Sequence, residues 1–381
     1  MKYLAIILVA VLAILIVVFI SWFLNMKANG KCPLCALKKI FIPTKLTIDI
    51  SEDEEYSENK VAQTPPMGWS SWNTFRNNID QDIIMQTAQA MNDSGLANAG
   101  YEFINLDDCW QSSLRDSDGK LQGDLGTFSR GIPKLIKDIN ALGLKVGLYS
   151  SNGTLTCEDL PASLGNERLD AKTIASWGCE FFKYDFCHHN RISGDCPAIE
   201  HIVITKPKSA FEIDLRPEDA EFTGRAKIIK MSDVPSKKAI GFISHGSGSA
   251  SFNFDADEKG EYVLTFVFHK SMAKKKQYMQ IHINGKMYEI FFPETKGFSP
   301  LGRQQIIVEL KEGTNNMTIK NPVATAIDSS YIQYKRMGDA LKEASSMWAK
   351  VTHSEEKPIT YSICEWGMAR PYLWGAKAGS M

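Results

Sequence analysis

The spacing of apolar residues divides this chain of 381 residues into segments of different character. Tyr3–Leu24 is a continuous apolar run that is broken only by Ser21. At about 1.5 Å per residue, a helix of this length spans the ~30 Å hydrocarbon layer of a bilayer, and no convincing cleavage site follows it. The pattern predicts an uncleaved, single-pass transmembrane anchor at residues 1–24. A linker should follow at 25–63, ending in the acidic run Ser51–Glu55.

Short apolar strands and amphipathic helices alternate from residue 64 onward. Strands are predicted at Met67–Trp72, Tyr101–Leu106, Lys145–Tyr149 and Phe181–Tyr184, and helices at Asp80–Ser94, Ile132–Leu142 and Asn166–Ser176. Such alternation at short intervals is typical of an α/β protein with a parallel sheet, or of a (β/α)₈ barrel.

Period-two alternation replaces the helical spacing between about residues 208 and 335. Strands are predicted at Ser249–Phe254, Tyr262–Phe268, Tyr278–Ile283, Met287–Phe292, Gln304–Leu310 and Asn316–Ile319. Turn signals such as Asn284-Gly285 and Glu312-Gly313 separate several of them. This pattern indicates an antiparallel β-sandwich of the size of a domain.

The earlier rhythm then resumes, with a helix predicted at Arg336–Lys350 and a strand at Ile359–Ile363. The sandwich is therefore predicted as an insertion at 208–335, between a first barrel part at 64–207 and a continuation at 336–381.

The overall charge gives no sign of a nucleic-acid partner, because 43 basic residues nearly cancel 44 acidic ones. Lysines are more frequent after the apolar run than before it, which taken alone would keep the bulk of the protein in the cytoplasm. A role in polysaccharide degradation argues for the opposite orientation, so both orientations remain open.

Polar and aromatic residues gather at the carboxyl ends of the five predicted strands. They are Trp69 and Trp72; Asp107 and Asp108; Tyr149; Lys183 and Asp185; and Glu365 and Trp366. In a barrel of this class the chemistry takes place at these strand ends. Buried carboxylates are costly without partners, and an aromatic face beside carboxylates suits the C–H surface and the hydroxyls of a sugar. The pattern therefore predicts a carbohydrate site.

The motifs at these strand ends resemble glycoside hydrolase family 27, the melibiase-type α-galactosidases. They match that family's strand motifs in order: Thr64–Asn73, Asn105–Trp110, Gly143–Tyr149, Lys183–Cys187 and Tyr361–Gly367. The likeness covers about residues 64–200 and 336–381. It implies a (β/α)₈ barrel, of which about the first five strands are present here, and a retaining hydrolase that releases terminal α-linked galactose from α-galactoside oligosaccharides.

The resemblance also assigns roles to individual residues. Asp185 matches the nucleophile of the family, and Lys183 would keep it ionised. Residues implied in substrate binding are Trp72, Asp107, Asp108, Tyr149, Lys183 and Glu365. Cys157 and Cys187 match a disulfide of the family at the rim of the pocket, which would imply an oxidising compartment and an extracellular catalytic part.

Two expectations concern what accompanies the site. The family's acid/base aspartate follows its sixth strand, beyond Met381, so residues 1–381 alone are expected to be inactive or poorly folded. The predicted sandwich resembles carbohydrate-binding modules of families 6 and 35, which implies a structural calcium ion with Glu221 as a ligand. No other metal or cofactor is expected.

Two alternative functions remain open. One is another activity of the same family, α-N-acetylgalactosaminidase or β-L-arabinopyranosidase. The other is a non-catalytic, membrane-anchored protein that binds galactose.

Overall fold

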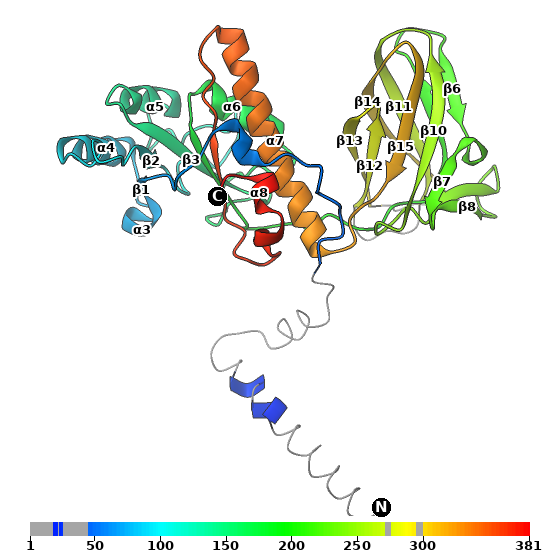
Figure 1. Ribbon diagram of the computed structural model, residues 1–381, viewed down its shortest axis with the longest axis horizontal. Helices are drawn as coiled ribbons and strands as arrows, with labels where there is room; N and C mark the ends of the chain where they lie inside the picture. Colours follow the sequence, from blue (N-terminus) through cyan, green and yellow to red (C-terminus); the bar gives the residue numbers. More distant parts are fainter. Residues whose placement is uncertain (1–17, 22, 26–44, 271–275, 295–299) are drawn as a thin grey trace, which may run out of the picture. The chain divides into compact units, whose positions relative to one another are not determined.

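The computed structural model describes residues 18–21, 23–25, 45–270, 276–294 and 300–381 (Figure 1). None of the helices within these ranges is both long enough and apolar enough to span a membrane. The anchor predicted at residues 1–24 lies mostly outside the described residues, and so does most of the predicted linker before residue 45. Residues 46–381 form one compact unit.

A parallel sheet forms the first part of this unit. Its strands follow the order β1 (Gly68–Ser70), β2 (Phe103–Asn105), β3 (Lys145–Ser151), β4 (Phe181–Asp185) and β16 (Thr360–Ile363). All four neighbouring pairs are parallel. The helices of this part are α3 (Trp72–Phe75), α4 (Gln81–Asp93), α5 (Ile132–Asn140), α6 (Glu167–Ser176), α7 (Ala326–Thr352) and α8 (Gly375–Ala378), with 3₁₀ turns η1 (Tyr56–Asn59) and η3 (Pro371–Leu373). The predicted parallel sheet is confirmed.

Helix α4 shows how local sequence sets the elements of this part. The carboxylate of Asp80 accepts hydrogen bonds from the amides of Asp82 and Ile83, at 2.9 and 2.8 Å, and so caps the helix. One face of α4 buries the apolar residues Ile84, Ala88 and Met91. Gly95, with φ of 81°, takes the left-handed conformation just past the end of the helix.

Antiparallel strands make up the second part, a sandwich of two sheets (Figure 1). One sheet has the order β13 (Lys286–Phe292), β12 (Gln277–Ile283), β15 (Gly313–Lys320), β10 (Gly248–Ala256) and β7 (Glu221–Gly224). The other has the order β14 (Leu301–Leu310), β11 (Gly260–His269), β5 (Ile199–Thr205), β9 (Lys238–Gly241) and β8 (Lys227–Lys230), with β6 (Glu212–Leu215) paired to β5 and the 3₁₀ turn η2 (Pro217–Asp219) following β6. Alternate residues of these strands form one apolar core, as the period-two pattern predicts.

The predicted limits of the sandwich need correction at both ends. Its first strand is Ile199–Thr205, which pairs with β11, so the boundary predicted at residue 208 is too late. Helix α7 begins at Ala326 rather than Arg336, because Thr325 and Asp328 form a capping box at its start. The segment 326–335 is therefore helical and does not belong to the sandwich.

Part of the predicted linker also needs correction, because residues 46–63 pack against the parallel part. The Thr47 hydroxyl donates to the Asp328 carboxylate at 2.7 Å. Tyr56 is only 1% exposed and donates to the carbonyl of Ile359 at 2.8 Å. Asp53, within the acidic run, accepts a hydrogen bond from a tyrosine of α7, Tyr331. The acidic run is thus not wholly solvated.

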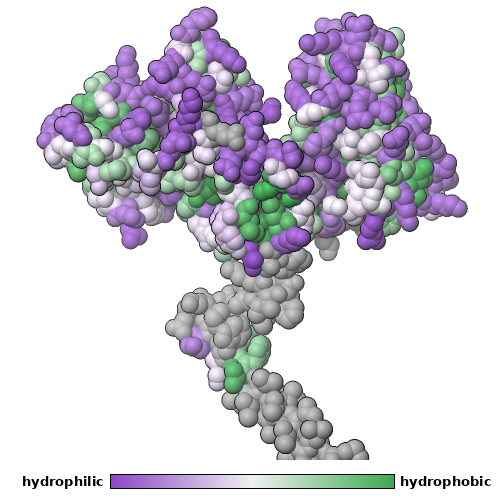
Figure 2. Space-filling view, in the orientation of Figure 1, coloured by the Kyte–Doolittle hydropathy of each residue, from purple (hydrophilic) through white to green (hydrophobic). Residues whose placement is uncertain are grey.

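The outer edge of β16 is occupied over part of its length. The amide of Ile363 donates to the carbonyl of Met381 at 2.7 Å, and the amide of Met381 donates to Tyr361 at 3.2 Å. Large apolar side chains are nevertheless exposed after β16, with Tyr372 at 78% and Leu373 at 42%. Figure 2 shows an apolar patch near α8 on an otherwise mainly hydrophilic face.

Candidate functional site

The predicted acids come together at the carboxyl ends of β2 and β4. Asp107 and Asp108 follow β2, and Asp185 is the last residue of β4. All three are buried, with exposed fractions of 5%, 1% and 6%. They reach one place because β2, β3 and β4 are parallel neighbours, and the carboxyl ends of parallel neighbours meet at one edge of the sheet.

Lys183 joins two of these acids. Its Nζ lies 2.7 Å from Asp107 Oδ2 and 3.9 Å from Asp185 Oδ2, and 5.0 Å from the centre of the Tyr149 ring. Burial alone would lower the pKa of Lys183, but the charges of Asp107 and Asp185 outweigh burial and raise it. Lys183 therefore stays protonated and balances charge between the two carboxylates.

The Asp185 carboxylate is held at both oxygens. Oδ1 accepts hydrogen bonds from the indole Nε1 of Trp366 at 2.7 Å and from the amide of Phe186 at 2.8 Å. Oδ2 accepts the phenol proton of Tyr149 at 3.1 Å. Burial, followed by the charges of the nearby acids, raises the pKa of Tyr149 well above its usual value, so the phenol remains a donor.

Backbone amides orient Asp107 and Asp108. The Asp107 amide donates to the Ser71 hydroxyl at 2.9 Å, and Asp107 Oδ1 accepts from the Asp108 amide at 2.9 Å. The carboxylate of Asp108 accepts from the amides of Cys109 and Glu158, at 2.8 and 3.0 Å. Burial raises the pKa of Asp108 above its ordinary value, although these hydrogen bonds act in the opposite direction.

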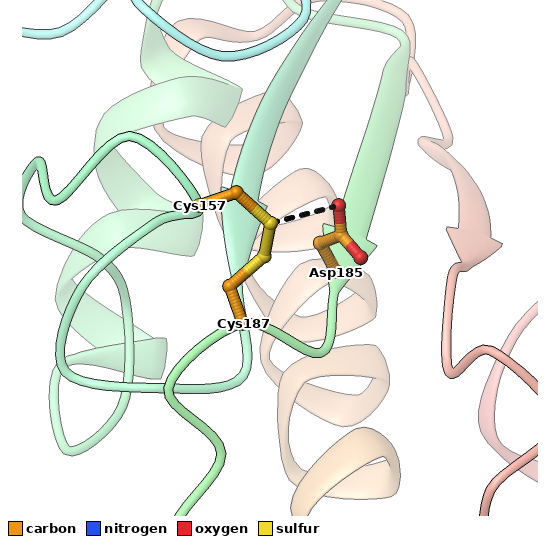
Figure 3. Close-up of side chains that lie close together, drawn as sticks. All are labelled: Cys157, Asp185 and Cys187. Carbon is orange, nitrogen blue, oxygen red and sulfur yellow. Dashed lines mark hydrogen bonds between the residues drawn. A yellow bond between two sulfur atoms is a disulfide. The ribbon is translucent and has the colours of Figure 1, made fainter. Parts of the chain in front are cut away.

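A disulfide between Cys157 and Cys187 lies beside Asp185 (Figure 3), as the resemblance implies. Cys157 Sγ is 4.0 Å from Asp185 Oδ2. Among the described residues, these three form the one cluster with three side chains of metal-binding type, and its two sulfurs are bonded to each other. Glu221 lies exposed at the start of β7, outside this cluster, so the calcium site stays a prediction.

Two of the predicted binding residues, Glu365 and Trp72, make contacts other than those with Lys183 and the three acids. Glu365 is 1% exposed, and its Oε1 accepts a hydrogen bond from the amide of Ala369 at 2.7 Å. Trp72 opens helix α3, and within the described ranges no hydrogen bond or ring contact joins its side chain to Asp185.

Trp366 was missing from the predicted binding residues, although its indole bonds to Asp185. Its backbone is in the left-handed region, with φ of 58°, which is uncommon for a bulky residue. Its side chain is 59% exposed. The signal in the sequence was its place at a predicted strand end, directly after Glu365.

A cavity of about 790 Å³ lies away from the acid cluster. Its walls come from the start of α6, from α7 between Tyr331 and Glu343, from β12 and β13, and from the segment around Asp49, and none of the predicted site residues lines it. The acid cluster is therefore identified from its chemistry rather than from this cavity.

Comparisons with known proteins give a consistent result for the first part of the chain. The sequence model of the family described as "Alpha galactosidase A" matches residues 64–201. An α-galactosidase of Coffea arabica is 52% identical over 136 residues, which is 35% of this chain and 36% of that protein. The chain spans 34–40% of the length of three such curated relatives.

Solved structures were also compared. An α-galactosidase of Saccharomyces cerevisiae aligns with a TM-score of 0.44 at 22% identity, covering 85% of this chain and 40% of that one. A family 35 carbohydrate-binding module of Clostridium thermocellum aligns with a TM-score of 0.26 at 20% identity, covering 28% of this chain and 83% of that one. The sequence matches are what confirm the predicted resemblance: over residues 64–201 this chain is similar to the melibiase-type α-galactosidases of glycoside hydrolase family 27.

Proposed function

We propose that this chain carries the nucleophile of a retaining α-galactosidase, and that its five parallel strands are the first five of a (β/α)₈ barrel. The observation that carries this proposal is the ion cluster in which Lys183 contacts both Asp107 and Asp185. A nucleophilic carboxylate must be ionised and fixed under the anomeric carbon. Lysine and the donors Trp366 and Tyr149 serve both needs.

In the proposed reaction an oxygen of Asp185 attacks C1 of the galactoside, and the bond from C1 to the leaving oxygen breaks. The leaving group takes a proton from an acid that we do not assign among the described residues. Water then attacks C1 of the glycosyl-enzyme and gives one proton to the conjugate base of that same unassigned acid, which releases galactose and regenerates the Asp185 carboxylate. Asp107 and Asp108 are proposed to accept hydrogen bonds from sugar hydroxyls, and Tyr149 to line the pocket.

We also propose that this part of the chain works in an oxidising, extracytoplasmic compartment, anchored through residues 1–24. The disulfide between Cys157 and Cys187 supports this location, because disulfides persist in such compartments. Labelling of the chain in intact cells with a membrane-impermeant reagent tests the orientation.

The test uses a fluorinated α-galactosyl fluoride, because fluoride leaves without a proton donor. If Asp185 is the nucleophile, the intact mass of the chain increases by one fluorogalactosyl group, and peptide mapping places that group on Asp185. Asp185→Asn should abolish the adduct, and Asp118→Asn, at an exposed acid, should not. Galactose binding without any adduct would instead favour the non-catalytic alternative.

A further inference from the structure

A partly buried ion network connects the sandwich to the parallel part. Arg336 of α7 forms two hydrogen bonds with Glu289 of β13, at 2.6 and 2.7 Å, and a third with Glu167 of α6, at 3.2 Å. The side chains are 16%, 16% and 5% exposed, in the order Arg336, Glu289 and Glu167. A two-point arginine–carboxylate contact fixes orientation as well as distance. This network therefore sets the position of α7 relative to β13.

The sandwich holds Glu289 firmly. Tyr278 of β12 donates its phenol proton to Glu289, and the Gln280 amide donates to that phenol oxygen at 3.0 Å. The guanidinium of Arg336 also lies 5.8 Å from the centre of the Phe291 ring. Burial alone would lower the pKa of Arg336, but the charges of Glu289 and Glu167 and the hydrogen bonds to Glu289 together outweigh burial and raise it, so the guanidinium remains a donor.

The same helix reaches the backbone of the predicted nucleophile. Tyr334, two residues before Arg336, donates its phenol proton to the carbonyl of Asp185 at 3.1 Å. This carbonyl also accepts from the amide of Asn152 at 2.8 Å. Tyr334 is fully buried, and its ring packs edge-on against Tyr184 with centroids 5.4 Å apart. A shift of α7 would thus be transmitted to Asp185 through a rigid side chain.

We propose that Glu289 of the sandwich is a positioning residue for the Asp185 carboxylate, acting through Arg336 and Tyr334. This inference rests on the proposed function in assigning a reaction to Asp185, but the mechanical connection can be tested without that reaction. Glu289 lies 104 positions after Asp185 in the sequence and belongs to the sandwich. The sandwich would then be a structural part of the catalytic apparatus and not only a tethered module.

The first test is hydrogen exchange in the full chain, with the Asn152 amide as the reporter of the Asp185 carbonyl. Glu289→Gln keeps the size of the side chain and removes its charge, and Tyr334→Phe removes only the phenol hydroxyl. Each should speed exchange at Asn152 by roughly tenfold while leaving the Ile281 amide in β12 unchanged. Glu309→Gln, which removes an exposed ion pair of the same sandwich, is the matched control.

For the two glutamate variants, either of two results would overturn the inference: unchanged exchange at Asn152 in Glu289→Gln, or an equal increase in Glu309→Gln. If exchange at Ile281 also rises in Glu289→Gln, that variant has destabilised the sandwich as a whole. The result for Tyr334→Phe then decides whether α7 is connected to Asp185. No change at Asn152 in Tyr334→Phe would also reject the connection.

The second test follows covalent labelling by the fluorinated galactosyl fluoride. Glu289→Gln should lower the maximal labelling rate roughly tenfold with little change in the reagent concentration for half-maximal rate, because sugar contacts are intact and only the nucleophile is displaced. Glu289→Asp, which keeps the charge, should restore part of the rate. If the unaltered chain is never labelled, the proposed function is wrong. The hydrogen-exchange experiment still tests the connection from Glu289 to Asp185, because it does not depend on the reaction.

Discussion

The parallel part buries Asp107, Asp108 and Asp185 at its strand ends around the half-buried Lys183, whereas the core of the sandwich consists of apolar side chains. Many ion pairs of the sandwich lie at its surface, as Lys286–Glu309 does, with side chains 53% and 68% exposed. Burying a charged group without full compensation destabilises the folded state, so stability alone does not explain a buried charge. We infer that the buried charges at the strand ends of the parallel part serve the proposed chemistry, whereas the sandwich buries few charges, Glu200 among them.

The largest effect on stability is expected when one partner of a buried ion pair is removed from the parallel part. Arg115 forms two hydrogen bonds with Asp170, at 2.6 and 2.8 Å, and Asp170 is fully buried. Arg115→Ala should lower the free energy of unfolding by about 3–5 kcal/mol, because it leaves an uncompensated buried carboxylate. Urea unfolding at pH 7 measures the loss.

A pH series separates this electrostatic cost from lost packing. Burial raises the pKa of Asp170, and the loss of Arg115 should raise it further. A carboxyl whose pKa is raised on folding contributes most below its unfolded value of about 3.9, and this contribution falls as the pH rises. The deficit of Arg115→Ala should therefore narrow as the pH falls toward 4; a deficit that stays constant would show that packing dominates.

A smaller effect concerns two half-buried histidines, one in each part. Burial lowers the pKa of His189 and of His282 to about 4. Between about pH 6.5 and 4 the unfolded chain binds protons at these rings and the folded chain does not, so stability falls as the pH falls through this window. Nearby cations, Arg191 and Lys320 respectively, act in the same direction as burial.

His189→Gln and His282→Gln should each remove part of this acid sensitivity, about 1–2 kcal/mol per site after allowance for the partial exposure of the rings. Thermal unfolding at pH 7 and pH 5 is the measurement. An equal reduction of the acid sensitivity in the two variants would show that both parts contain a histidine that destabilises the fold at low pH. A reduction in only one variant would restrict this effect to that part.

Sequence patterns predicted the sandwich well where alternation was strong and missed it where alternation was weak. The predicted strands Tyr278–Ile283 and Met287–Phe292 differ from β12 and β13 by one residue at the start. The first strand, Ile199–Thr205, was missed, because the sequence analysis assigned this segment to the first barrel part at 64–207. Pairing with β11, more than fifty residues later, is a tertiary contact that local pattern does not encode.

Prediction of the site depended on a different signal. The positions of Asp107, Lys183 and Asp185 at strand ends were enough to propose that they meet, because parallel strands align their carboxyl ends. The contact between Trp366 and Asp185 was not predicted, although Trp366 follows a predicted strand end; its backbone is left-handed, which is uncommon for a bulky residue. The connection from Glu289 through Arg336 to Asp185 was not predicted either. The predicted helix began at Arg336, whereas α7 begins at Ala326 and so includes Tyr334.

A matched core substitution should show that the apolar interiors of the two parts are equivalent. Ile281 of β12 is fully buried in the sandwich, and Ile104 of β2 is fully buried in the parallel part. Changing either to valine should cost about 0.5–1.5 kcal/mol through a lost methylene and a small cavity. Denaturant unfolding of both variants tests this. A much larger cost at Ile104 would mean that the acid cluster tightens the packing around β2.

The smallest effect is expected at the surface of the sandwich. Lys286 and Glu309 form an ion pair at 2.8 Å, and the hydrogen bond from Lys286 lowers the pKa of Glu309. Stability from such a pair is present above the unfolded pKa of the carboxyl and is lost as the pH falls through its folded pKa. Because both side chains are exposed, water and salt screen the attraction. Glu309→Gln should therefore leave the thermal midpoint at pH 7 unchanged within measurement, at low salt and at high salt. A clear drop that disappears with added salt would show that the sandwich also depends on its charges, and would remove the contrast with the parallel part.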